Sequence, residues 1–134
     1  MITVKTTVNT SIEDTWKFWT TPEHITQWNN ASEDWHTPHA ENDLRVGGKF
    51  KFTMASKDGT ISFDFEGEYT KVENHSLIEY KLGDDRKVDV YFISIDNQVQ
   101  IIESFDPENV HSEELQRQGW QAILDNFKKY AESF

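Results

Sequence analysis

The sequence contains no cysteine among its 134 residues. Disulfide bonds, thiolate catalysis and thiolate metal ligands are therefore excluded. No apolar run approaches the ~18 residues of a membrane span, and the first residues lack the apolar region of a signal peptide. Basic residues are also scarce, since 13 Lys and Arg against 24 Asp and Glu give a net charge of -11. Phosphate backbones and anionic lipids repel such a polyanion, so we expect a soluble, cytoplasmic protein without nucleic-acid or membrane partners.

Hydrophobic residues make up 36% of the chain, which is below the usual share. Aromatic residues compensate, because there are nine Phe, five Trp and four Tyr and each such side chain buries about 150 to 250 Å². The length suits one domain, so residues 1–134 are expected to form a single domain with a real core. A monomer and a homodimer both stay open.

The longest helical pattern runs from Ser112 to Phe134. Steps of about 100° per residue gather its apolar residues in one broad arc, with charged and amide side chains opposite. Gln116 interrupts this arc. Either its amide faces water in a frayed first turn, or it points into a cavity beneath the helix. The arc itself is formed by Gly119, Trp120, Ile123, Leu124, Phe127, Tyr130, Ala131 and Phe134.

The chain begins with an alternating segment over residues 2–8, which predicts a half-buried strand. Ser11 and Asp14 then resemble a capping box and predict a helix over residues 12–19. Thr21 as N-cap and Pro22 at the first helical position predict a second short helix that ends near Trp28.

Residues 29–42 are polar and irregular, and they predict the longest loop, a flexible lid. Residues 43–46 predict a short strand, followed by a bend at Gly47-Gly48. Within the loop, His36 and His39 are close in sequence, but Pro38 excludes a regular helix and no third ligand is identifiable. We therefore expect no metal and no cofactor.

The middle of the chain predicts an antiparallel meander, because alternating segments are separated by turn residues. The cleanest alternation places Ile61, Phe63, Phe65 and Tyr69 on one face and acidic residues on the other. The predicted strands cover residues 49–55, 61–69, 77–82, 87–95 and 98–105.

Glu103 stands on the apolar face of the last predicted strand, between Ile101 and Phe105. An isolated buried charge is costly, so the carboxyl must be paired, hydrated or protonated. The alternative is that the strand end reaches water or bulges there. For nucleophilic catalysis the sequence offers neither a nucleophile-elbow pattern nor a serine with evident partners, so we expect a binding protein rather than an enzyme.

Taken together, these segments resemble the START-like (SRPBCC) helix-grip superfamily, and within it the single-domain proteins similar to the C-terminal domain of the Hsp90 ATPase activator Aha1. Trp16 and Trp28 would anchor the short helices, and Gly119 would let a strand approach the long helix. The segments that carry the resemblance are residues 11–16, 21–28, 43–50 and Gly119-Trp120 with Leu124, Phe127 and Tyr130.

The resemblance implies an α+β helix-grip fold: a curved antiparallel β-sheet of six to seven strands wrapped around the C-terminal helix, with two short helices after the first strand. It also implies a cavity between sheet and helix. The leading hypothesis is that this cavity binds a small hydrophobic or aromatic molecule. The alternatives are an adaptor or activator of an Hsp90-type chaperone, linked to the stress response, and a polyketide cyclase-like enzyme with Glu103 as base.

Aromatic side chains that line a cavity and aromatic side chains that fill a core give the same sequence pattern, so both interpretations stay open for each residue. Glu103 and Gln116 are the polar groups expected to orient a ligand, and we hypothesise that they pair with each other. The candidate ligand-binding residues are Trp28, Trp35, Phe52, Met54, Phe63, Phe65, Tyr69, Tyr80, Phe92, Glu103, Gln116 and Trp120.

Overall fold

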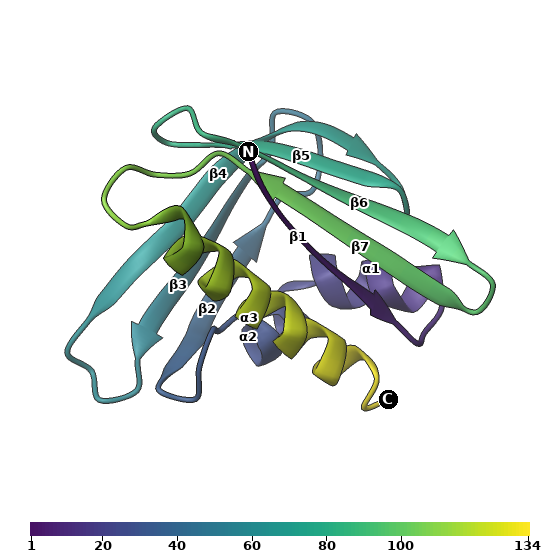
Figure 1. Ribbon diagram of the computed structural model, residues 1–134, viewed down its shortest axis with the longest axis horizontal. Helices are drawn as coiled ribbons and strands as arrows, with labels where there is room; N and C mark the ends of the chain where they lie inside the picture. Colours follow the sequence, from purple (N-terminus) through teal and green to yellow (C-terminus); the bar gives the residue numbers. More distant parts are fainter.

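A computed structural model describes residues 1–134 as one antiparallel sheet of seven strands with three helices (Figure 1). The strand order is β1-β7-β6-β5-β4-β3-β2, so every neighbour except β1–β7 is a hairpin. The elements are β1 (Ile2–Val8), α1 (Ile12–Thr20), α2 (Pro22–Trp28), β2 (Trp35–Asn42), β3 (Lys49–Ser56), β4 (Ser62–Glu73), β5 (Leu77–Leu82), β6 (Lys87–Ile95), β7 (Gln98–Phe105) and α3 (Glu113–Ala131).

The sheet curls around α3, which crosses its concave side, while α1 and α2 connect β1 to β2 and lie against α3 (Figure 1). The predicted α+β helix-grip fold is confirmed. None of the three helices is long and apolar enough to cross a membrane.

The two longer helices begin where the sequence predicts. The Ser11 hydroxyl accepts a hydrogen bond from the Asp14 amide at 3.1 Å, and the Ser112 hydroxyl accepts one from the Leu115 amide at 3.1 Å. Both bonds satisfy a donor that a helix N-terminus leaves free. Thr21 precedes α2 without such a side-chain bond, and Pro22 at the first position supports that helix instead.

The core lies between α3 and the β1–β7–β6 part of the sheet. Alternation along these strands sends every second side chain inward. The aromatic anchor of this core is Phe127, whose ring lies 4.9 Å from those of Trp19 and Trp28. Its fully buried side chains include Val8, Val90, Val99, Ile101, Phe105, Leu124 and Phe127.

The prediction of a loop over residues 29–42 is wrong for its second half, which forms β2 at the edge of the sheet. The pairing with β3 shifts register between His36 and His39, so the alternation is interrupted at Pro38. Proline is tolerated on an edge strand because its missing N–H needs no partner there. Because β2 is polar and bulged, its sequence does not alternate between apolar and polar residues, and the strand could not be predicted from that pattern.

The predicted short strand over residues 43–46 is also wrong, because this segment forms the turn between β2 and β3. The Gly48 amide donates to the Arg45 carbonyl at 2.8 Å, and Val46 is 63% exposed. Glycine is required here: Gly47 has φ of +83°, and a Cβ on Gly48 would lie 2.0 Å from the Asp43 carbonyl oxygen.

Side chains of α3 cover the free edge of β1. Arg117 donates to the Thr3 carbonyl at 3.3 Å, Gln121 donates to the Lys5 carbonyl at 3.2 Å, and Lys128 donates to the Thr7 carbonyl at 2.5 Å. Successive outward carbonyls of the strand are thus satisfied by one face of the helix. The polar side of α3 that the sequence predicts therefore stabilises the edge of the sheet by hydrogen bonding to β1.

Candidate functional site: an apolar cavity under the C-terminal helix

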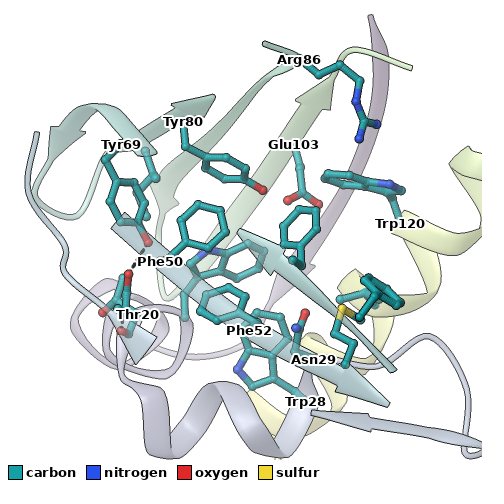
Figure 2. A pocket seen from close by; sticks show the side chains of 17 residues that line it. Thr20, Trp28, Asn29, Phe50, Phe52, Tyr69, Tyr80, Arg86, Glu103 and Trp120 are labelled. Atoms are coloured by element: carbon teal, nitrogen blue, oxygen red, sulfur yellow. Dashed lines mark hydrogen bonds between the residues drawn. The ribbon is translucent and has the colours of Figure 1, made fainter. Parts of the chain in front are cut away.

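A cavity of about 290 Å³ lies between α3 and the concave face of the sheet, and Figure 2 shows the side chains around it. Twelve of its 17 lining residues are hydrophobic. The lining residues are Trp19, Thr20, Trp28, Asn29, Asn42, Phe50, Phe52, Met54, Phe63, Phe65, Tyr69, Ile78, Tyr80, Arg86, Glu103, Trp120 and Ile123.

One wall comes from the inward faces of β3 and β4. In their register Phe52 pairs with Phe65 and Met54 pairs with Phe63, so these side chains stand opposite one another on the same face. Phe63 is 47% exposed and also lines a polar surface groove, together with Phe65 and Arg86. The cavity therefore opens toward solvent near these residues.

The opposite wall comes from α3, where Trp120 faces the sheet (Figure 2). Its indole stacks on Phe105 with ring centroids 3.9 Å apart and planes 10° apart, and it meets Phe65 edge to face at 6.1 Å. One face of the Trp120 indole packs on Phe105, and the rest of this partly buried side chain borders the cavity.

At the end near α2, the polar side chains of the cavity hydrogen-bond within the protein. The Tyr69 hydroxyl donates to the Asn42 side-chain oxygen, and the Asn42 amide donates to the Thr20 carbonyl at 2.7 Å. The Trp28 indole N–H donates to the Phe18 carbonyl at 2.9 Å. Burial is the main reason that the pKa of Tyr69 is raised. These hydrogen bonds hold α1, α2 and β2 together.

Glu103 is the one carboxyl group in the cavity wall. It is 7% exposed, and its neighbours across the ladder on the same face are Val4 and Val90. β7 keeps its register through this position, so the alternative of a bulge or a strand end in water is wrong. Burial without any hydrogen-bond partner or nearby cation raises the pKa of Glu103 to about 8. Burial thus favours the neutral form of this carboxyl group, whose O–H can donate a hydrogen bond.

The Tyr80 hydroxyl points toward the Glu103 carboxyl in Figure 2. The pKa of Tyr80 is raised, first by burial and then by the charge that Glu103 carries when ionised. Sequence reasoning placed both residues in the cavity but did not place them side by side. Their strands are separated by β6, so only the strand order reveals the pairing.

Arg86, Asn29, Asn42 and Thr20 line the cavity without having been predicted. Arg86 lies at the end of the β5–β6 turn, where its Nε donates to an Asp84 carboxylate oxygen at 2.7 Å. A turn residue with an acidic neighbour looks like an ordinary surface cation, so the sequence carries no signal for this role.

The structure does not bring all the candidate residues together. Trp35 lies outside the cavity wall, 5.9 Å from the Phe63 ring, and Phe92 is buried against Trp16 and Trp19. The candidates that line the cavity are Trp28, Phe52, Met54, Phe63, Phe65, Tyr69, Tyr80, Glu103 and Trp120.

Gln116 is also absent from the cavity wall. It is 8% exposed, so the frayed-turn alternative is wrong. Its amide hydrogen-bonds the loop before α3: it accepts from the Glu108 amide at 2.9 Å and donates to the Glu108 and His111 carbonyls at 3.1 and 2.9 Å. The hypothesised pairing with Glu103 is therefore wrong, because Gln116 organises a loop.

No group of three His, Cys, Asp or Glu side chains is arranged to hold a metal ion. His36 and His39 flank the register shift of β2, and the His39 imidazole lies 3.6 Å from the Glu41 carboxylate on the surface. What the cavity offers is apolar surface and two polar groups without a hydrogen bond to the protein, the carboxyl group of Glu103 and the hydroxyl of Tyr80.

Comparison with known proteins gives a consistent answer. The chain matches the family described as Activator of Hsp90 ATPase homolog 1-like protein over residues 9–132. The solution structure of the AHSA1-like protein from Aeromonas hydrophila has a TM-score of 0.90 and 42% identity, covering 98% of this chain and 93% of that chain. The solution structure of Chr148 from Cytophaga hutchinsonii has a TM-score of 0.85 and 52% identity, covering 98% of this chain and 92% of that chain.

A more distant structure, NE0264 from Nitrosomonas europaea, shares the fold at 15% identity, with a TM-score of 0.81 over 98% of this chain and 94% of that chain. No curated protein matches the sequence. The chain therefore belongs to the family of Activator of Hsp90 ATPase homolog 1-like proteins, within the START-like helix-grip superfamily.

Proposed function

We propose that this protein binds a small hydrophobic or aromatic molecule in the cavity under α3. The observation that carries the proposal is an apolar hollow of about 290 Å³ with a polar group in its wall that has no partner in the protein. Ligand pockets are typically apolar, with a few polar groups that fix orientation. The resemblance to helix-grip proteins implies a ligand of this kind as well.

The volume limits the ligand. An engineered cavity of about 150 Å³ takes up benzene, so a hollow of about 290 Å³ suits a compound of roughly two rings. Such a ligand would gain about 25 cal/mol for each Å² of apolar surface that it buries. The aromatic rings of Phe52, Phe65 and Trp120 offer flat surfaces for it.

An enzymatic function with Glu103 as general base is less well supported. No His, Cys, Lys or second carboxyl group lines the cavity to share the acid-base work with Glu103. Action on an Hsp90-type ATPase stays a prediction from the family alone, because no feature of the cavity bears on it.

The experiment is native mass spectrometry of the protein purified from its own cells, with two tryptophan variants. Met54→Trp fills the cavity, whereas Ile93→Trp adds the same bulk on β6 at a side chain that is 41% exposed. We expect a retained small molecule on the wild type and on Ile93→Trp, and none on Met54→Trp. Equal retention by both variants would place the ligand elsewhere.

If nothing co-purifies, uptake of a library of one- and two-ring compounds is measured by ligand-observed NMR. The absence of any uptake by the wild type would refute the proposal. Uptake that Met54→Trp abolishes and Ile93→Trp preserves would support it.

A further inference from the structure

The polar side chains of the cavity fall into two groups. Those near α2 have partners: Asn42 bridges Tyr69 and Thr20, and the Asn29 amide donates to the Thr37 hydroxyl at 3.3 Å. Arg86 is paired with Asp84 at the turn. Tyr80 and Glu103 have no hydrogen bond to the protein.

The protein has no fully buried side-chain N or O atom without a partner. The polar atoms of Tyr80 and Glu103 are therefore in reach of the cavity space rather than sealed inside the core. Figure 2 shows the Tyr80 hydroxyl and the Glu103 carboxyl group directed toward each other, with the Trp120 indole beside Glu103. The fold thus leaves two hydrogen-bonding groups unused at one place in an otherwise satisfied site.

Both groups are set up as donors. A phenol carries an O–H, and a carboxyl group enclosed by Val4, Val90 and aromatic rings is kept in its neutral O–H form. A protonated acid beside a tyrosine, both in an apolar site, is a known arrangement for holding a carbonyl oxygen. Two donors side by side suit an acceptor oxygen with two lone pairs, such as a carbonyl oxygen.

We propose that the ligand is a ring compound bearing a carbonyl group, whose oxygen accepts hydrogen bonds from Tyr80 and Glu103 while its ring lies against Trp120 and Phe65. This inference rests on the proposed function and names the ligand class. A cationic amine fits less well, because it requires an ionised Glu103 between two valines, and Arg86 is the only other charged lining residue.

The test compares three probes with one carbon skeleton: 1-tetralone, tetralin and 1-aminotetralin. Affinities are measured by titration calorimetry on the full chain. We expect the ketone to bind about tenfold more tightly than the hydrocarbon, as two modest net hydrogen bonds allow. Tyr80→Phe and Glu103→Leu should each reduce this preference while binding of tetralin is kept. Glu103→Gln should retain it, because the amide still donates.

A second readout is the infrared carbonyl stretch of bound ¹³C-labelled 1-tetralone. We expect a shift to lower frequency on the wild type and a smaller shift on Tyr80→Phe and Glu103→Leu, since hydrogen bonds weaken the carbonyl bond. A role of these side chains in packing alone would leave the stretch unchanged.

The outcomes separate the two proposals. If tetralin binds as tightly as 1-tetralone, or if 1-aminotetralin binds most tightly, the carbonyl inference is overturned and the apolar binding site stands. If none of the three probes binds, both proposals are overturned for ligands of this size.

Discussion

Two regions of the same concave face differ in how they are filled. Under α1 and the second half of α3, the inward side chains of β1, β6 and β7 are buried: Val8, Val90 and Val99 have 0% exposure, as does Phe127 of α3. On β3 and β4 the inward Phe52 and Phe65 are only partly buried. We call these the packed half and the hollow half.

The difference comes from the position of the long helix. α3 packs against β1, α1 and α2, and has no comparable contact with β3 or β4. A curled sheet that is wider than one helix can cover leaves part of its inner face open. The two halves have the same alternation in sequence, so a cavity arises here from helix placement and not from residue type.

The largest contrast is expected between Phe127→Ala and Phe52→Ala. Phe127 packs between two tryptophan rings in the packed half, so its truncation should lower the free energy of unfolding by about 3 to 5 kcal/mol. Phe52→Ala enlarges a space that already exists and should cost roughly half as much. Urea unfolding measures both. Equal losses would mean that the hollow half is as tightly packed in solution.

The next effect concerns Glu103, whose pKa is raised from its ordinary value of 4.5 to about 8. Between these values the folded state keeps a proton that the unfolded chain has released, so stability falls as pH rises, by up to about 1.4 kcal/mol per unit. Glu103→Gln removes this loss and should stabilise the protein by roughly 3 kcal/mol at pH 7.

The measurement is urea unfolding of wild type and Glu103→Gln from pH 4 to pH 9. The difference should be near zero below the unfolded pKa, grow through neutral pH and level off above about pH 8. A difference that does not change with pH would show that water reaches the carboxyl group and that this wall of the cavity is open.

A smaller effect is expected at the first turn of α3. Gln116→Ala removes three hydrogen bonds that hold Glu108 and His111, and the loss should be about 1 to 2 kcal/mol. Because Gln116 lies outside the cavity wall, ligand affinity should not change in this variant. An affinity lost together with stability would connect the loop to the hollow half.

The smallest effect is a gain. A Cβ on Gly119 would meet no atom within 4 Å, so Gly119→Ala should stabilise α3 by about 0.5 to 1 kcal/mol through helix propensity. Thermal unfolding detects such a change. Gly67→Ala is the control, because there a Cβ would lie 2.8 Å from the Phe50 ring and should destabilise the protein.

The sequence was informative where one physical signal decides the structure. The capping box at Ser11, the helical period that starts at Ser112 and the alternation from Phe63 to Tyr69 predicted their elements. Alternation failed for β2, whose bulge and Pro38 erase the period. The resemblance implied that Gly119 lets a strand approach the long helix, but a Cβ there would meet no atom within 4 Å, so the structure does not contain this close approach.

The site was predictable only in part. Inward aromatics of β3 and β4 follow from alternation, but the choice between Phe65 in the cavity and Phe92 in the core depends on where α3 and α1 lie. Gln116 looked like a cavity group because its place on the helix is apolar, and its real partners come from a loop with no pattern. Arg86 was missed for the same reason.

The two ends of the sheet are protected in different ways, and this bears on how the protein behaves at high concentration. Open strand edges are templates on which chains add to one another and aggregate. Along β1, three side chains of α3 donate hydrogen bonds to the outward carbonyls and so cover the edge. Along β2, Pro38 and the register shift interrupt the regular row of backbone donors and acceptors. The second half of the segment that the sequence predicts as a lid thus forms an edge strand, β2, on which a strand of a neighbouring molecule cannot pair regularly.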